Sequence, residues 1–568
     1  MTFSTRKTSQ RKFSVLAAAA ILAFSSSAMA DVKESYLEYD GGPQWLGAND
    51  GLGNLSAGLT SNRPWSGNTS LPSSVGLSFK GVSQFDLRNL LGGSFIPPDT
   101  MGAVGATQFM EATNGVYAIY SKSTGALQSM VKADTFWTAA GATGGLNGDA
   151  RVLFDAPSQK WVALQFGASV SDIQIAVSTT SSATGPWQST KFTGFAGGAF
   201  GGIADFPTLA IDAAGVYIGT NNFTCTNAAC ASTFSGTTLN VISRADLFGA
   251  VPTAANVKQF VTPFTGVSPP DADRGFAIQG VNSTGATSGR IVAASLYSDN
   301  ALRYNVVNPG TAGATLTGNS TLTLTPYQAN NVKGSQPDGT LNIDTGDQRI
   351  AGNAWEQNGK IYFVYTAQSV GSNHTEVRYV VSNATTNAII QQGAISDANY
   401  DFYQGSIAVN ASGQVVIGYN RSGTSAVDGQ VTLFARTYNS DAAGNLVQTD
   451  QLLLHVSPVN DYHNGSVQGA ASVGRQRWGD YSAVTLDPNN AQSFWVIGQY
   501  AEVWNNVAGC TPGNPPGCTQ TNGSSWGTWI ADINVAALPI PEPQTYGMMM
   551  LGLLAVGGMV RRKAAAKA

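Results

Sequence analysis

The chain has 568 residues, of which only 11% are charged and 65 are glycines. Residues 1–30 and 541–568 hold eight basic residues and one acidic residue, so the rest of the chain has 22 Lys and Arg against 33 Asp and Glu, a net charge near −11. This acidic, lysine-poor body argues against nucleic acid as a partner, because phosphate neutralisation needs a basic face. So few charged residues cannot coat many amphipathic helices, and short strands joined by Gly, Asn and Ser turns are expected.

Residues 1–30 have the pattern of a secretory signal peptide. Four basic residues precede an apolar stretch at 13–24, and Ala28-Met29-Ala30 forms an A-x-A-like cleavage site. We therefore expect export by Sec-type machinery and a mature chain that begins at Asp31. An uncleaved membrane helix is the alternative, which is disfavoured because the apolar stretch is shorter than the roughly 20 residues that a bilayer needs.

Residues 31–85 are poor in strand patterns and rich in Gly, Asn, Ser and Pro. This composition predicts an extended N-terminal segment that either closes against the next domain or stays mobile.

Residues 86–535 contain a recurring pattern: a short strand, a polar turn and a second strand rich in Val, Ile, Tyr and Trp. Asp or Asn often begins the turn, where an Asx-turn or a left-handed residue is favoured. The copies span 109–120, 152–166, 209–223, 278–297, 351–366, 407–420 and 484–500. Their second strands are spaced at loose intervals of about 44 to 79 residues.

Repeats of several strands at this length are typical of a β-propeller, in which each blade is covered by its two neighbours. The prediction is therefore an all-β chain with a seven-bladed β-propeller over 86–535. Tandem β-sandwich domains are the main alternative. A β-helix is less favoured because its rungs are shorter and more regular.

The four cysteines form two local pairs. Cys225 and Cys230 flank a short loop, and Cys510 and Cys518 flank a Pro/Gly-rich loop. Each pair is predicted to close as a disulfide, as expected in an oxidising compartment. Zinc is disfavoured because the spacing is not C-x-x-C and no histidine is close in sequence.

Acidic and basic residues recur just before the small-residue strands that begin several copies. The acids are Asp99, Asp205, Asp347, Asp401 and Asp480, and the arginines are Arg151, Arg274, Arg349 and Arg477. In a propeller the innermost strands line the central channel. These residues are therefore predicted to surround one mouth of the channel, and all except Arg151 are the candidate ligand-binding residues. No catalytic residue is assigned.

Two interpretations of this ring of charges stay open. As a site for a carbohydrate or an anionic ligand, it would use carboxylates to bind hydroxyl groups or to act as acid and base, and arginines to bind a carboxylate through two hydrogen bonds. As a structural feature, each Asp would cap a turn or pair with a neighbouring Arg.

No metal or cofactor is predicted, with Ca²⁺ as the alternative. The three histidines, His374, His455 and His463, form no close pair and no H-E-x-x-H motif. Loop carboxylates that could bind Ca²⁺ occur at Asp271 and Asp273 and at Asp338, Asp344 and Asp347. Neither grouping has EF-hand spacing.

The C-terminal segment has three parts in order: Pro541-Glu542-Pro543, an apolar stretch at 546–560, and a basic cluster at 561–563. This arrangement resembles the PEP-CTERM sorting signal of Gram-negative bacteria. The resemblance implies transient membrane insertion of residues 536–568 and cleavage near the Pro-Glu-Pro by exosortase, a membrane protease. The basic cluster favours a cytoplasmic C-terminus during translocation. A retained tail anchor is the alternative.

The stretches 97–114, 205–221 and 477–500 resemble a broad group of secreted bacterial propeller proteins. The Asp-box of sialidases, S-x-D-x-G-x-T-W, is absent, so no sialidase residue is carried over. The predicted function is an exported binding or structural component of the cell surface or extracellular matrix, associated with exopolysaccharide. A glycosidase- or lyase-like enzyme with its site in the channel mouth is the alternative, and a scaffold for protein contacts is a third hypothesis.

Overall fold

The computed structural model describes residues 44–45, 73–142, 148–167, 169–264, 273–285, 289–311, 313–328, 334–337, 339, 342–441, 443–463, 475–505 and 523–535. The predicted signal peptide, the PEP-CTERM-like tail and the Cys510–Cys518 pair lie outside these residues. Among the residues that are described, no helix is both long enough and apolar enough to cross a membrane.

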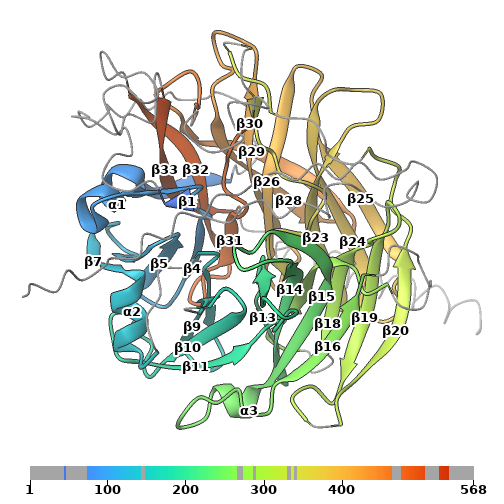
Figure 1. Ribbon diagram of the computed structural model, residues 1–568. Helices are drawn as coiled ribbons and strands as arrows, with labels where there is room; N and C mark the ends of the chain where they lie inside the picture. The colour runs from blue at the N-terminus through green and yellow to red at the C-terminus, as the bar shows by residue number, and fades with distance from the viewer. Residues whose placement is uncertain are drawn as a thin grey trace, which may run out of the picture.

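The chain is an all-β protein with the β-propeller fold. Four-stranded antiparallel units follow one another along the chain, and Figure 1 shows them arranged around a common centre. We interpret each unit as one blade and number the blades 1 to 7. The innermost strands, in blade order, are β4 (Met101–Val104), β8 (Arg151–Asp155), β12 (Gly202–Asp205) with β13 (Ala210–Ile211), β17 (Phe276–Asn282), β22 (Ala354–Gln357), β26 (Tyr400–Val409) and β31 (Ala483–Leu486).

The remaining strands complete each blade outwards from the centre. The second strands are β5 (Gln108–Thr113), β9 (Lys160–Phe166), β14 (Gly215–Cys225), β18 (Arg290–Ala294), β23 (Lys360–Gln368), β27 (Val415–Gly423) and β32 (Ser493–Asn505). The third strands are β6 (Val116–Ser121), β10 (Asp172–Ser178), β15 (Ser232–Ser243), β19 (Ala301–Val307), β24 (Thr375–Asn383), β28 (Thr432–Ser440) and β33 (Gly523–Asn534). The outermost strands are β7 (Leu127–Lys132), β11 (Trp187–Thr193), β16 (Lys258–Pro263), β20 (Thr315–Leu322), β25 (Ile389–Ile395), β29 (Leu446–Val456) and β2 (Ser74–Ser83).

Burial follows this order from centre to rim. The inner strand β4, with the sequence MGAV, is buried throughout, whereas most residues of the outer strand β20 are exposed. Small residues suit the inner strands because neighbouring strands crowd together near the axis. Between blades, larger side chains fill the space, as where Val416 of β27 belongs to one apolar cluster with Val484 and Val496 of blade 7. A parallel pairing of Val281 with Ala354 also joins the inner strands of blades 4 and 5.

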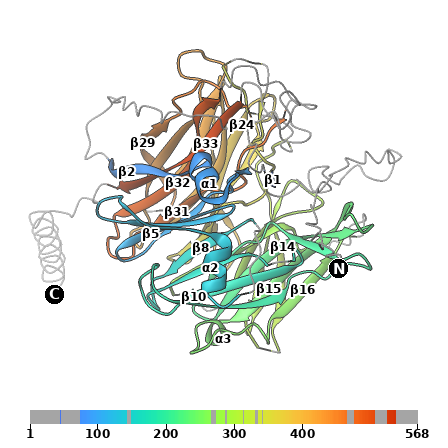
Figure 2. The same ribbon diagram turned by 60° about the vertical axis from the view of Figure 1, so that its left-hand side comes forward.

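Strand β2 closes the ring from the N-terminal side. It pairs antiparallel with β33, from Ser74 opposite Asn534 to Ser83 opposite Gly527. Figure 2 shows β2 at the edge of the sheet that contains β32 and β33. Blade 7 therefore combines strands from both ends of the described chain. The strand lies inside residues 31–85, which were expected to be extended, so the propeller begins before the predicted boundary at residue 86.

Blades 1 and 7 meet at the buried carboxyl group of Glu111 in β5. The Val82 N–H and the Tyr120 hydroxyl each donate to Glu111 Oε2 at 3.0 Å. Thr528 Oγ1 of β33 lies 2.6 Å from Glu111 Oε1. Burial is the largest cause of a rise in the Glu111 pKa to about 7. This carboxyl group thus links β2, β5, β6 and β33 at the seam of the ring.

The repeated hairpins lie where the sequence pattern indicates, with one shift in position. Six copies coincide with the hairpin of the first and second strands of a blade, such as 152–166 with β8 and β9. The copy at 109–120 is instead the hairpin of β5 and β6, the second and third strands of blade 1. The inner hairpin of that blade, β4 to β5, turns at Gly105 without an Asp or Asn.

Short elements connect the blades. Helix α1 (Gln84–Leu91) follows β2 and begins with a capping box between Ser83 and Asp86. The two other described helices are α2 (Ala133–Ala139) and α3 (Arg244–Leu247). Two-residue strands form the pairs β1 (Gln44–Trp45) with β3 (Phe95–Ile96) and β21 (Asn342–Ile343) with β30 (Arg475–Gln476). The second pair is parallel and brings the loop after β21 beside the loop after β30.

The predicted Cys225–Cys230 disulfide is present at the end of β14. It spans five positions in sequence, and the Thr226 N–H bonds to the Ala231 carbonyl at 2.7 Å within the same loop.

Replacing both Cys225 and Cys230 by Ser is expected to lower the free energy of unfolding by about 2 kcal/mol, because a short closed loop restricts the unfolded chain to this extent. Urea unfolding of the oxidised full chain measures the effect, and the Cys510→Ser/Cys518→Ser variant is the matched comparison. Equal stability of the 225/230 variant and the parent chain would contradict the expectation.

Candidate functional site

The charged residues gather where the chain enters the inner strands. Five non-glycine residues within or next to the inner strands have a positive φ, a conformation that is costly for most side chains. These residues are Asp99 (φ 46°), Asp149 (φ 59°), Phe206 (φ 49°), Ala277 (φ 46°) and Gln404 (φ 55°).

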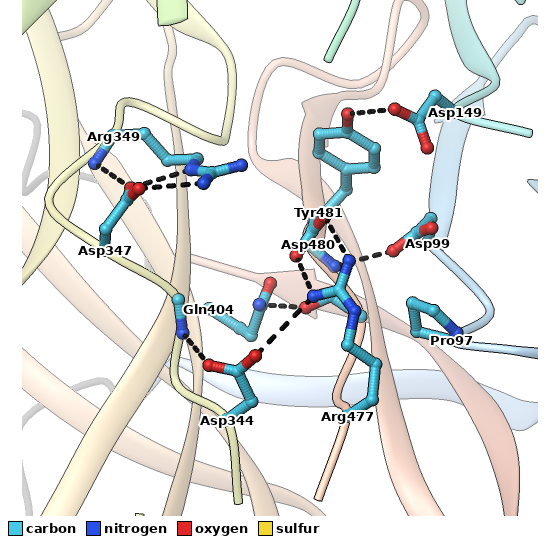
Figure 3. Close-up of polar contacts among 12 residues, drawn as sticks. Pro97, Asp99, Asp149, Asp344, Asp347, Arg349, Gln404, Arg477, Asp480 and Tyr481 are labelled. Carbon is cyan, nitrogen blue, oxygen red and sulfur yellow. Dashed lines mark hydrogen bonds and ion pairs between the residues drawn. The ribbon is translucent and has the colours of Figure 1, made fainter. Parts of the chain in front are cut away.

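Arg477 and Asp480 form the best-defined ion pair of this region. Arg477 Nη1 and Nη2 donate to the two Asp480 carboxylate oxygens at 2.8 and 2.9 Å, and Nη1 lies 3.7 Å from Asp344 Oδ2. The Asp480 N–H donates to Asp99 Oδ1 at 2.8 Å. Figure 3 shows Arg477 between Asp344 and Asp480. The pairing of β21 with β30 explains the approach, because Asp344 and Arg477 directly follow these two strands.

Asn114 connects Asp99 to the next blade. Its Nδ2 donates to Asp99 Oδ2 at 2.6 Å, and its Oδ1 accepts from the Asp149 N–H at 2.9 Å. The Tyr481 hydroxyl then donates to Asp149 Oδ2 at 3.1 Å, a contact visible in Figure 3. Burial is the largest cause of a raised Asp99 pKa, and the nearby Asp149 carboxylate raises it further, whereas Arg477 lowers it. The network therefore joins blades 7, 1 and 2 through buried polar groups.

Arg151 crosses the axis and contacts most of the ring. It is 2% exposed, its Nε donates to the Pro207 carbonyl at 2.7 Å, and its Nη1 donates to the Ala351 carbonyl at 3.0 Å. Its guanidinium carbon lies 3.6 Å from the centre of the Tyr481 ring. The side chain starts in blade 2 and reaches residues beside blades 3, 5 and 7, so it occupies the middle of the predicted channel. Burial is the largest cause of a lowered Arg151 pKa.

Asp347 and Arg349 form a second bidentate pair, on the blade 5 side. Arg349 Nε and Nη2 donate to Asp347 Oδ1 and Oδ2 at 2.7 and 2.8 Å. The Arg349 guanidinium carbon also lies 4.6 Å from the centre of the Phe206 ring and 5.4 Å from that of Phe276. This arginine is therefore held by a carboxylate and two aromatic rings.

A small pocket lies beside the two ion pairs. Its lining comprises Thr345, Gly346, Asp347, Arg349, Ala351, Tyr365, Thr366, Gln404, Gly405 and Asp480. Gly346, Arg349 and Ala351 are only half-buried, so the pocket reaches the surface on that side. Its cavity volume is about 20 Å³. One water molecule needs about 10–15 Å³.

Three predicted residues have other surroundings. Asp401 is buried between blades 5 and 6, where it accepts hydrogen bonds from the backbone N–H groups of Ser335 and Thr375, both at 2.9 Å, and pairs with His374 Nδ1 at 3.3 Å. The guanidinium carbon of Arg274 lies 5.6 Å from the centre of the ring of Tyr304, in the third strand of blade 4. Asp205 is buried at the end of β12, where it pairs across the sheet with Asn221 of β14.

The proposed calcium carboxylates are used within loops where they are described. Asp273 accepts from the Gly275 N–H at 2.8 Å and from the Ser295 hydroxyl at 2.6 Å, and Asp344 accepts from the Gly346 N–H at 3.2 Å. Asp271 and Asp338 lie outside the described residues. In the described part of the chain, no group of three or more His, Cys, Asp or Glu residues is arranged to hold a metal ion.

Sequence reasoning missed Asp149, Tyr481 and Gln404. Asp149 was detectable, because it stands two residues before β8 as Asp99 stands two residues before β4. Tyr481 follows the predicted Asp480 directly. Gln404 gives no comparable signal, since its importance comes from a positive φ and from contacts across two blades.

Comparison with known proteins leaves the family open. No family model matches the sequence, and no curated protein matches it. Similar solved structures include the Dos1 propeller, with 6% identity and a TM-score of 0.36 over 80% of this chain and 94% of that chain. They also include the WD40 domain of SCAP from fission yeast (9% identity, TM-score 0.31, 76% and 82% covered) and a GH43 endo-arabinanase from Bacillus licheniformis (10% identity, TM-score 0.28, 53% and 96% covered). The propeller fold of this chain follows from its own strand pairings.

Proposed function

We propose that the protein is an exported β-propeller that acts as a binding or structural component of the cell surface or extracellular matrix and associates with exopolysaccharide. The signal-peptide pattern and the PEP-CTERM-like tail in the sequence support export and sorting, with Sec-type machinery and exosortase as transient partners. The acidic, lysine-poor composition favours a partner other than nucleic acid.

The pairing of the predicted site acids with other groups of the protein argues against a catalytic role for them. Glycosidases commonly need two carboxyl groups that face the substrate, one to give a proton and one to attack or to activate water. Here Asp480 and Asp347 are each bound by an arginine through two hydrogen bonds, and Asp401 is held by loop N–H groups. Asp99 has a raised pKa but is only 1% exposed. This arrangement favours a structural role for the carboxylates.

The proposal is tested on bacteria that produce the full chain together with exopolysaccharide. Mass spectrometry of the mature protein is expected to give an N-terminus at Asp31 and a C-terminus near Pro541–Pro543, and the protein is expected to sediment with the exopolysaccharide. Cells whose exopolysaccharide synthesis is blocked are the control for sedimentation. A mature chain that still ends at Ala568 would contradict sorting, and protein left in the supernatant would contradict the polysaccharide association.

A further inference from the structure

The pocket beside the two ion pairs contains a buried acceptor that lacks a donor. Gln404 lines the pocket and is 7% exposed. Its Nε2 donates to the Gly479 carbonyl, which fixes the orientation of the amide, and its Oε1 is buried without a hydrogen-bond partner. Figure 3 shows this amide between the Arg349–Asp347 pair and the Arg477–Asp480 pair. An unpaired buried acceptor costs about 1–3 kcal/mol, so a ligand that donates a hydrogen bond here is favoured.

The charges around the pocket disfavour an anionic ligand. Among the residues that line the pocket, two carboxylates, Asp347 and Asp480, stand against one guanidinium group, Arg349. Arg477 pairs with Asp480 beside the pocket. Both arginines already direct two N–H groups at a carboxylate. A uronate group would therefore meet excess negative charge and two occupied arginines. This arrangement differs from the free arginine fork that a carboxylate-binding site needs.

The size of the pocket limits what can enter it. About 20 Å³ accommodates a group of one or two heavy atoms and not a whole sugar ring. The half-buried Gly346, Arg349 and Ala351 form the open side, where the rest of a larger ligand would lie on the surface. A hydroxyl or hydroxymethyl group has the right size, donates a hydrogen bond and carries no charge.

We propose that this pocket binds a hydroxyl or hydroxymethyl group of a neutral polysaccharide and discriminates against polymers of uronic acids. The inference rests on the exopolysaccharide association proposed above, and it adds the chemical class of the ligand and the residues that select it. Gln404 Oε1 accepts from the ligand hydroxyl, and the excess of carboxylates excludes anionic chains.

Affinity electrophoresis of the full chain in gels that contain dextran, galactomannan, alginate or polygalacturonate tests the proposal. Retardation by at least one neutral polymer is expected, with at least tenfold weaker retardation by both uronic acid polymers. Thr366→Val removes a pocket hydroxyl at nearly constant volume, and Gln404→Leu removes the acceptor. Each is expected to weaken neutral-polymer binding about tenfold, the effect of roughly one hydrogen bond. Thr321→Val, on the exposed outer strand β20, is the matched control and is expected to bind as the parent chain does.

The outcomes separate this inference from the proposed function. Equal or stronger binding to the uronic acid polymers, or neutral-polymer binding that Thr366→Val leaves unchanged, would overturn the pocket assignment while the polysaccharide association stands. Retardation by none of the four polymers, with failure to sediment with native exopolysaccharide, would overturn both. Since Thr366→Val is nearly isosteric, the conclusion does not depend on the folding of Gln404→Leu.

Discussion

Arg151→Met is expected to lower the free energy of unfolding by on the order of 4 kcal/mol, because it removes the side chain that spans the axis. The substitution leaves the buried Pro207 carbonyl without its donor, at about 1–3 kcal/mol, and the half-buried Ala351 carbonyl without its donor at a smaller cost. It also removes the cation–π contact with Tyr481, worth about 2 kcal/mol when desolvated. Relief from burying a charge offsets part of this loss.

Two further variants distinguish this role from a general effect of losing an arginine. Arg436→Met removes a half-buried arginine from the third strand of blade 6, where Nε donates to Gln451, and is expected to cost about 1 kcal/mol or less. Arg151→Lys keeps a charge but has no planar fork to reach two carbonyls at once, so most of the loss is expected to remain. Urea unfolding measures all three. An Arg151→Met variant as stable as Arg436→Met would show that Arg151 does not connect the blades.

The contacts of Arg151 also bear on the ring of charges that the sequence predicts at the mouth of the channel. The sequence pattern groups Asp99, Arg477 and Asp480, and these three residues contact one another in the structure. The pattern could not predict that Arg151 fills the middle of the channel. Its hydrogen-bond partners are backbone carbonyls, which every residue type has, so no sequence pattern marks them. Asp401 fits the same sequence pattern yet lies at a contact between blades, since the bulge at Gln404 in β26 separates it from the axis end of that strand.

Local pairing was predictable and distant pairing was not. The Asn114–Gly115 turn between β5 and β6 gives a strong hairpin signal, whereas the inner hairpin of blade 1 turns at Gly105 without an Asx residue. This difference explains why the copy at 109–120 marks the second and third strands of blade 1, whereas the other copies mark the first and second. The pairing of β2 with β33 joins residues about 450 positions apart. No local pattern specifies such a partner, so the sequence predicts only an extended segment over 31–85 that either closes against the next domain or stays mobile.

Glu111→Gln is expected to leave the protein well folded and to change how its stability depends on pH. In the parent chain, the Glu111 pKa rises from its usual 4.5 to about 7, chiefly through burial. The native state therefore holds the proton more tightly than the unfolded state. The resulting stabilisation is fully present below pH 4.5 and is lost as the pH rises to about 7, a change of about 3 kcal/mol.

The hydrogen bonds around Glu111 fit the neutral acid. Thr528 Oγ1 lies 2.9 Å from the Val82 carbonyl as well as 2.6 Å from Glu111 Oε1, and a hydroxyl has one proton to donate. If Thr528 donates to the carbonyl, a proton on Glu111 Oε1 completes the contact, while Oε2 accepts from Val82 and Tyr120. A glutamine can reproduce this pattern, with Nε2 as the donor to Thr528. The absence of a side chain at Gly81 leaves space for the Glu111 carboxyl group, because a Cβ at position 81 would lie 2.6 Å from Glu111 Oε2.

The measurement is the difference in unfolding free energy between Glu111→Gln and the parent chain from pH 4 to pH 8. The variant is expected to gain about 3 kcal/mol of unfolding free energy relative to the parent across this range. Only the parent loses stability as the pH rises, because its Glu111 must give up a proton in a buried site, whereas glutamine does not titrate. Glu111→Leu serves as the control: it leaves the Val82 and Tyr120 donors unpaired and is expected to be destabilised at every pH. A difference between Glu111→Gln and the parent that does not change with pH would mean that the Glu111 pKa is the same in the native and unfolded states, so that Glu111 is ionised at neutral pH. The seam between blades 1 and 7 would then be held by a charged carboxylate, and the closure of the ring by β2 would be insensitive to this proton.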